Sequence, residues 1–365
     1  MPTVSSQPRT LNAAQRIRLA VVTSALALAS APVAAQTAEK LYLFNWTEYA
    51  DPGVIAAFEE EYDVEVVESY FTSNAEMYSK LVAGGDAQFD VVVPTDYYVP
   101  RLVAADLIQP LDEVTGRDNL MPAFRHPSYD PEDRYSVPYL WGVTGIVYDS
   151  QTFADPPPSW SLLLDPEVNG DQPFALLGGD PQVLFGIACA YQGAGFDCTQ
   201  RDQWIAAAQL LQTTLDRSNF TGFVDSTAAI DQIARGVARV AVTYSGDLDY
   251  RKADAPETYA NLEFFIPEEG SQLGVDTLVV PKRAPHPELA QAFVNFMLRP
   301  ENAARSAEYA FYRTPNEAAL PLLDEPLRSA SRLDDAQRQR LAATPELEGD
   351  QLQMLQQLAN EVRSR

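Results

Sequence analysis

Residues 40–96 read KLYLFNWTEYADPGVIAAFEEEYDVEVVESYFTSNAEMYSKLVAGGDAQFDVVVPTD and alternate strand patterns with helix patterns. One helix is predicted to begin at Asp51-Pro52, because Asp is a strong N-cap and Pro suits the first helical position. A second is predicted after Ser73, since Ser73 and Glu76 have the spacing of a capping box. Strands that alternate with helices indicate an open α/β sheet. The strands predicted in this region are residues 41–44, 64–67 and 89–93.

The rest of the chain repeats this alternation with different spacing. Residues 204–215 are predicted to be helical, and residues 288–298 and 352–362 carry the apolar stripe of amphipathic helices. About 330 residues remain after the N-terminal segment, which is enough for two lobes rather than one core. Further strands are predicted at residues 136–148, 174–177, 238–243, 262–266 and 277–280.

The N-terminal residues 1–35 have the pattern of a signal peptide. Three arginines and no acid precede the apolar stretch 19–29, which is too short to span a bilayer as a stable helix. Val33-Ala-Ala-Gln36 is an acceptable cleavage site, and it has no Cys to carry a lipid. We expect a free periplasmic protein, with a single membrane anchor as the alternative.

The chain is strongly acidic. Its 26 Lys and Arg against 51 Asp and Glu give a formal charge of −25, which becomes −28 when residues 1–35 are removed. Such a surface repels nucleic acid and attracts cations over a Debye length, about 8 Å at physiological salt. The charge therefore argues against a nucleic-acid partner, which would need a basic footprint.

Cysteine and histidine are scarce. Cys189 and Cys198 lie nine positions apart, and in an oxidising compartment we expect a local disulfide, with two buried free thiols as the alternative. The two histidines, His126 and His286, each precede a proline and look like turn or helix-start residues. With only two histidines, the chain has almost no residues from which to build a histidine metal site or a Ser-His-Asp triad. No cofactor is predicted.

Aromatic and acidic residues gather where predicted strands end, the edge at which open α/β sheets bind ligands. Rings attract organic cations by about 0.5–2 kcal/mol each, and carboxylates form charge-assisted hydrogen bonds with ammonium groups. These loops therefore suggest a receptor for a flexible cation. They are residues 45–49, 94–98 and 244–247, with Asp276 before one strand and Tyr312 before Thr314-Pro315-Asn316.

Each of these residues also has a purely structural interpretation. Trp46 and Tyr49 suit a hydrophobic core, and Glu48 suits a solvated surface. Asp247 follows Gly246 and suits a helix cap, while Asp276 suits the end of a turn. These alternatives stay open from the residues alone.

Several stretches resemble the periplasmic spermidine/putrescine-binding proteins, in order, over nearly all of residues 38–320. The resemblance implies a two-lobed clamshell, with an open mixed sheet in each lobe and helices on both faces. It implies capture of one polyamine for an inner-membrane ABC permease, by a chain we expect to be monomeric. The expected lobes are 36–144 plus 277–323, and 145–276 plus 324–365. The matching stretches are residues 40–49, 89–95, 135–142, 298–300 and 312–316.

The resemblance also implies ligand contacts and shows departures. Tyr244 stands where the family usually has Trp, Gly274 where another ring stacks, and Val183 where a Glu pairs an ammonium. Asp180 could compensate for that Glu, although an N-cap is its simpler role. The further candidates are Asp96, Asp180, Val183 and Gly274. The implied contacts are Trp46, Thr47, Glu48, Tyr49, Thr95, Tyr97, Tyr244, Asp247, Asp276 and Tyr312.

Two other functions remain open at this stage. The same fold could bind another cationic solute, such as agmatine, or an amino-acid derivative, and the departures at Gly274 and Val183 keep that alternative alive. A secreted hydrolase that uses two carboxylates is more remote, because it explains neither the ordered motifs nor the aromatic loops. We predict binding without catalysis.

Overall fold

The computed structural model describes residues 39–111, 114–224, 227–332, 339–347 and 349–364, and Lys40–Arg365 forms one compact unit. The predicted signal peptide, 1–35, lies outside the described residues. Among the described residues, each helix lacks the length or the apolar character needed to cross a bilayer.

The first part of the chain forms the predicted strand–helix alternation. Strands β1 (Glu39–Trp46), β2 (Val64–Phe71) and β3 (Val91–Val92) form a sheet in the order β2-β1-β3, with β1 and β3 parallel. Helix α2 (Pro52–Tyr62) begins as predicted, because Asp51 accepts hydrogen bonds from the backbone N–H groups of Gly53 and Val54.

The predicted capping box of α3 (Asn74–Val82) is half right. Ser73 Oγ accepts from the Glu76 backbone N–H at 3.2 Å. The Glu76 carboxylate reaches the backbone N–H of Thr72 instead of that of Ser73, at 2.9 Å. It also accepts from the Thr72 hydroxyl, so its hydrogen bonds go to Thr72 and not to the backbone N–H of Ser73.

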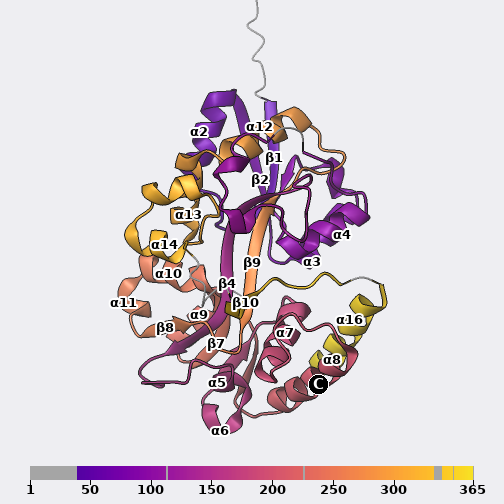
Figure 1. Ribbon diagram of the computed structural model, residues 1–365. Helices are drawn as coiled ribbons and strands as arrows, with labels where there is room; N and C mark the ends of the chain where they lie inside the picture. Colours follow the sequence, from indigo (N-terminus) through magenta and orange to yellow (C-terminus); the bar gives the residue numbers. More distant parts are fainter. Residues whose placement is uncertain (1–38, 112–113, 225–226, 333–338, 348, 365) are drawn as a thin grey trace, which may run out of the picture. The chain divides into compact units, whose positions relative to one another are not determined.

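Two long antiparallel strands connect the sheets. β4 (Val137–Asp149) pairs with β9 (Ser271–Leu278) and, farther along, with β7 (Val240–Tyr244) and β8 (Leu262–Phe265). The sheet order is β10-β9-β4-β7-β5-β6, with β5 (Phe174–Leu176), β6 (Phe220–Phe223) and β10 (Leu341–Ala342). Isolated bridges join Val92 to Val279 and Thr95 to Asp276. Figure 1 shows β4 and β9 side by side.

The expected position of one strand was wrong. β9 starts at Ser271, six residues before the predicted start at 277, so Asp276 lies within the strand and not ahead of it. Pairing with β4 extends β9 through Gln272 and Gly274, whose composition gives no strand signal. Long-range pairing outweighs local propensity here. The strand predicted at 89–93 is reduced to Val91–Val92.

Helices cover these sheets. α12 (Pro287–Met297) lies one residue before the range expected from its apolar stripe, and α8 (Arg201–Leu215) ends as predicted and starts three residues earlier. The other α-helices are α4 (Val99–Ala104), α5 (Ser161–Leu164), α6 (Pro166–Asn169), α7 (Pro181–Tyr191), α9 (Thr227–Ala234), α10 (Ser245–Asp254), α11 (Pro256–Tyr259), α13 (Pro300–Ala310), α14 (Glu325–Ala330) and α16 (Gly349–Arg363). Short 3₁₀ helices occupy Gly85–Ala87, Asp96–Tyr98, Arg117–Asn119, Pro122–Phe124 and Glu317–Leu322.

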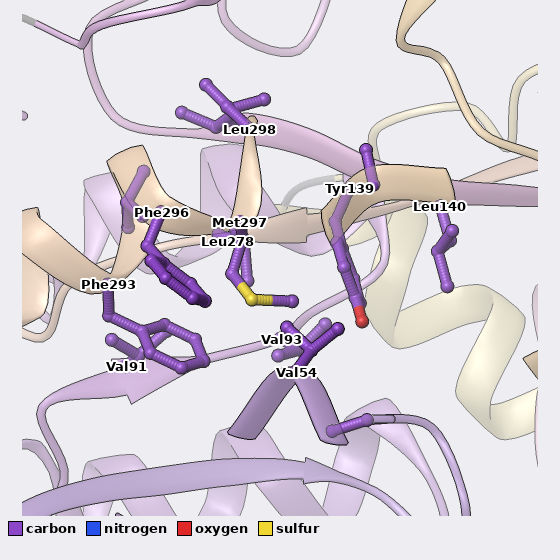
Figure 2. Close-up of a cluster of buried hydrophobic side chains, with 14 of the residues drawn as sticks. Val54, Val91, Val93, Tyr139, Leu140, Leu278, Phe293, Phe296, Met297 and Leu298 are labelled. Carbon is purple, nitrogen blue, oxygen red and sulfur yellow. The ribbon is translucent and has the colours of Figure 1, made fainter. Parts of the chain in front are cut away.

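Two separate clusters of buried side chains hold the bulk of the core. The first, here the N-terminal core, joins residues 41–140 to residues 278–323. Figure 2 shows Val54 of α2, Val91 of β3 and Phe293 of α12 within it. The second, here the C-terminal core, joins residues 146–242 to residues 347–362. Each fully buried Leu, Val or Phe contributes about 1.5–3 kcal/mol, so both clusters are substantial sources of stability.

Cys189 and Cys198 form a disulfide, with their Cα atoms 6.3 Å apart. Both cysteines belong to the C-terminal core, and the bond ties the end of α7 to the segment before α8. Such a bond stabilises the fold chiefly because it restricts the unfolded chain.

The double substitution Cys189→Ala/Cys198→Ala should lower the free energy of unfolding by about 2–3 kcal/mol, since the bond closes a short loop. Urea unfolding followed by far-UV circular dichroism measures the difference. As a control, a reductant should destabilise the wild type and leave the double variant unchanged. An unfolding free energy equal to that of the oxidised wild type would contradict the prediction.

Candidate functional site

A cavity of about 390 Å³ lies where the ends of β1, β3 and β7 meet the middle of β4 and β9. Every residue that the family resemblance implied as a ligand contact lines it, and so do three of the four further candidates. These thirteen are Trp46, Thr47, Glu48, Tyr49, Thr95, Tyr97, Asp180, Val183, Tyr244, Asp247, Gly274, Asp276 and Tyr312.

Asp276 is a partly buried carboxylate of the cavity wall. Its Oδ2 accepts from the Tyr49 hydroxyl at 2.6 Å, and its Oδ1 accepts from Thr95 Oγ1 at 2.7 Å. Burial raises the pKa of Asp276 to about 6, against the two hydrogen bonds, which lower it. Both donors are neutral, so the negative charge of Asp276 remains available to a ligand.

A chain of hydrogen bonds continues from Thr95 to a second carboxylate. The Asn74 side-chain amide donates to Thr95 Oγ1 at 3.0 Å and to the Tyr97 hydroxyl at 3.2 Å. The Tyr97 hydroxyl in turn donates to Asp180 Oδ2. Desolvation raises the pKa of Asp180 and, even more, that of Tyr97.

Asp180 caps a helix, the simpler of the two roles expected from the sequence, and its position at the cavity is compatible with the other. Its Oδ1 caps α7 by accepting from the backbone N–H groups of Gln182 and Val183, while its side chain also lines the cavity. The N-terminus of a helix favours negative charge, so part of the Asp180 charge is already compensated.

A third carboxylate, Asp247, lies in the first turn of α10. It accepts from the Tyr312 hydroxyl at 3.1 Å and from Thr243 Oγ1 at 3.0 Å. The ring of Tyr312 fits between Gly142 and Gly246. A Cβ atom at either glycine would lie within 2.7 Å of the ring, so only glycine allows this ring position.

The aromatic residues serve both the core and the cavity. Tyr49 belongs to the N-terminal core and packs edge-on against Tyr312, with ring centroids 5.3 Å apart, while its hydroxyl reaches Asp276. Trp46 is half-buried against Phe71. Glu48 is exposed, with φ of 57°, and its charge adds to burial in raising the pKa of Tyr250.

Asp96 does not line the cavity. It is 2% exposed and accepts a hydrogen bond from the backbone N–H of Tyr97. Burial raises its pKa to about 8. The carboxyl group points into the protein because Asp96 begins a 3₁₀ turn, which places its neighbours Thr95 and Tyr97 at the cavity instead.

The sequence interpretation missed about half of the cavity wall. Tyr98 lies in the loop 94–98 that the sequence singled out, although it was not predicted as a contact, and Tyr250 lies three residues after Asp247. Gln272 would have been found if β9 had been placed correctly, because alternate residues of a strand share one face. The missed residues are Phe71, Thr72, Ser73, Asn74, Ala75, Tyr98, Gly142, Thr144, Gly179, Pro181, Thr227, Tyr250, Gln272 and Ala310.

The charge of the cavity wall is one-sided. Four carboxylates and eight aromatic side chains line it, and the described lining residues include no Lys, Arg or His. The carboxylates are Glu48, Asp180, Asp247 and Asp276, and the rings are those of Trp46, Tyr49, Phe71, Tyr97, Tyr98, Tyr244, Tyr250 and Tyr312.

Comparison with known proteins identifies the family. Residues 53–330 match the family described as bacterial extracellular solute-binding protein. The chain is 34% identical to a spermidine/putrescine-binding periplasmic protein of Salmonella typhimurium, over 86% of this chain and 88% of that one. It is 30% identical to a putrescine/cadaverine-binding protein of Pseudomonas aeruginosa, over 91% and 95%.

A solved structure agrees with these matches. The substrate-binding protein of a spermidine/putrescine ABC transporter from Streptococcus pneumoniae superposes with a TM-score of 0.75 at 29% identity, covering 89% of this chain and 99% of that one. Its fold is the mixed α/β fold described above. The chain therefore belongs to the bacterial extracellular solute-binding proteins.

Proposed function

We propose that this chain is a periplasmic binding protein that captures a polyamine of the putrescine or spermidine class and delivers it to an ABC importer. The observation that carries the proposal is the cavity wall, with four carboxylates, eight aromatic rings and no basic side chain among its described residues. The names of the relatives, which bind putrescine, cadaverine or spermidine, support the same ligand class.

The chemistry of the wall fits such a ligand in two respects. Carboxylates form charge-assisted hydrogen bonds with ammonium groups, and an ammonium buried without one costs several kcal/mol. Aromatic faces contact the methylene groups and attract the charge, by about 0.5–2 kcal/mol per ring. Asp276 lies beside Tyr49 and Tyr312, so one ammonium can meet a carboxylate and rings together.

The proposal includes closure of two lobes, 36–144 plus 277–323 and 145–276 plus 324–365. The N-terminal and C-terminal cores support this division, because their members fall almost wholly on opposite sides of it. The cavity wall includes residues of both proposed lobes. Tyr49 and Tyr312 belong to the first lobe, and Asp180 and Asp247 belong to the second. Hinge rotation between lobes is the common way in which such receptors enclose a ligand.

The remaining parts of the proposal concern the fate of the ligand and the location of the protein. The ligand leaves chemically unchanged, because the chain serves transport and not catalysis. The protein acts in the periplasm as a monomer, hands its ligand to an inner-membrane permease and needs no cofactor. Recovery of unaltered ligand after long incubation, checked by mass spectrometry, separates this function from that of a carboxylate-dependent hydrolase.

The direct test is isothermal titration with putrescine, cadaverine, agmatine, spermidine and a set of amino acids. We expect at least one diamine or polyamine to bind with a Kd in the micromolar range or below, about −8 kcal/mol or more favourable. Binding confined to an amino acid or to agmatine would replace the proposed ligand while keeping the solute-binding role.

Asp276→Asn should weaken polyamine binding at least about tenfold, because the variant keeps the shape of the side chain and removes its charge. Asp96→Asn is the matched control, since Asp96 is a buried neighbour that does not line the cavity. Its affinity should stay within about threefold of the wild type. Equal affinity in Asp276→Asn and the wild type would show that Asp276 does not pair the cation.

Binding should weaken in acid. The ligand pairs the ionised form of Asp276, whose pKa of about 6 lies above the usual value for Asp, so protonation competes with the ligand below pH 6. The Kd for putrescine should rise about tenfold between pH 7 and pH 5. Titration at each pH measures this, and Asp276→Asn should give a flatter profile. A wild-type Kd constant over that range would contradict the assignment.

Selectivity for ligand length should be shallow, under about tenfold between putrescine and spermidine, or ~1.4 kcal/mol. Val183 gives its part of the wall no charge, and Gly274 contributes no ring, although a Cβ there would meet Gln272 and Thr95 at 3.8 Å, an ordinary contact distance. Val183→Glu combined with Gly274→Phe should sharpen the preference. A wild type that already separates the two ligands a hundredfold would contradict this prediction.

A further inference from the structure

One face of β9 forms a row along the cavity. Gln272, Gly274 and Asp276 all line it, as alternate residues of one strand must. A strand rises by about 3.3 Å per residue, so the ends of this row are about 13 Å apart between Cα atoms. The row therefore presents a carboxylate at one end and a carboxamide at the other, with Gly274, which has no side chain, between them.

The carboxamide of Gln272 is held in a fixed orientation. The side chain is 4% exposed. Its Oε1 accepts from Thr144 Oγ1 at 2.8 Å, and its Nε2 donates to Thr344 Oγ1 at 2.7 Å. In the part of the chain that the structure describes, these are the side-chain hydrogen bonds of this amide. One N–H and one oxygen lone pair are left for a ligand.

The hydrogen-bond partners of the Gln272 side chain are neutral. Thr144 also lines the cavity and is uncharged. Pro345 follows Thr344, the residue that accepts from Gln272. The Pro345 carbonyl accepts a hydrogen bond from Gln182 Nε2 at 2.8 Å. Gln182 precedes Val183 at the start of α7, and the apolar side chain of Val183 lines the cavity.

Asp180, three residues before Val183, already accepts hydrogen bonds within the protein. It caps α7 and accepts from Tyr97. An ammonium beside Gln272 would offer only donors, and would leave the amide N–H facing another donor. A buried donor without a partner costs about 1–3 kcal/mol. A ligand amide has one acceptor and one donor, and so complements Gln272 at both atoms.

We propose that Gln272 forms a neutral subsite that receives an uncharged amide, so that the chain takes amines whose second end is acylated, as in an N-acetylated diamine. This rests on the proposed function, since the free ammonium of the same ligand pairs with Asp276. The acyl methyl group lies against Val183, and the methylene chain passes over Gly274, which has no side chain to obstruct it.

The experiment compares putrescine with N-acetylputrescine by isothermal titration on three proteins. The wild type should bind N-acetylputrescine at least as tightly as putrescine. Gln272→Glu, which adds a charge to the subsite, should shift the ratio of the two Kd values toward putrescine by at least about tenfold. Gln356→Glu is the control for added charge, because Gln356 is exposed on α16, and its ratio should match the wild type.

A second variant tests the orientation of the amide in case Gln272→Glu fails to fold, as judged by thermal melting. Thr344→Val removes the hydroxyl that accepts from Gln272, and it should reduce the preference for N-acetylputrescine at least about threefold. A ratio unchanged in both variants would overturn the subsite alone. Failure of the wild type to bind either amine would overturn the proposed function and the subsite with it.

Discussion

The pairing of β4 with β9 is the constraint on which the rest of the structure depends. The two strands run antiparallel with Trp141 opposite Val275 and Gly142 opposite Gly274. At one end of the pair, Val137 and Leu278 belong to the N-terminal core. Beyond the other end, β4 continues to Ile146 of the C-terminal core and pairs with β7. In their middle, Trp141, Val143 and Val275 pack in a small separate cluster, and the alternating residues form one wall of the cavity. A change of register by one residue would turn Asp276 and Gln272 away from the cavity, because side chains alternate along a strand.

The electrostatics of the cavity follow from this placement. Carboxylates buried in a wall without basic side chains are costly, and the cost appears as the raised pKa of Asp276 and Asp180. Hydroxyl donors from Tyr49, Thr95 and Tyr97 reduce this cost without neutralising the charge. Under the proposed function, a cationic ligand pairs with these carboxylates, so their attraction to it offsets part of the cost of their burial.

The sequence predicted the order of strands and helices well and the geometry of β9 poorly. Caps and apolar stripes are local, so α2 and α12 lie within one residue of their expected starts. The early start of β9 depends on β4, more than 120 residues away, and no local pattern in Gln272 or Gly274 reports it. Many cavity residues were predicted because they lie in loops that follow strands. Cavity residues within a strand, such as Gln272, or at the start of a helix, such as Asn74, were not predicted. The ligand contacts themselves remain predictions.

Tyrosine, rather than lysine or arginine, is what allows the cavity to hold carboxylates and still attract a cation. Burial and nearby carboxylates raise the pKa of Tyr49, Tyr97 and Tyr312 well above the ordinary value, so each phenol stays protonated and donates one hydrogen bond. A lysine at any of these positions would form an ion pair, and removing one partner of a buried ion pair is strongly unfavourable. A ligand ammonium would then have to compete with a fixed internal cation. A phenol brings both an aromatic ring and a hydroxyl donor to the wall, so under the proposed function the same side chain can orient the acid and attract the cation.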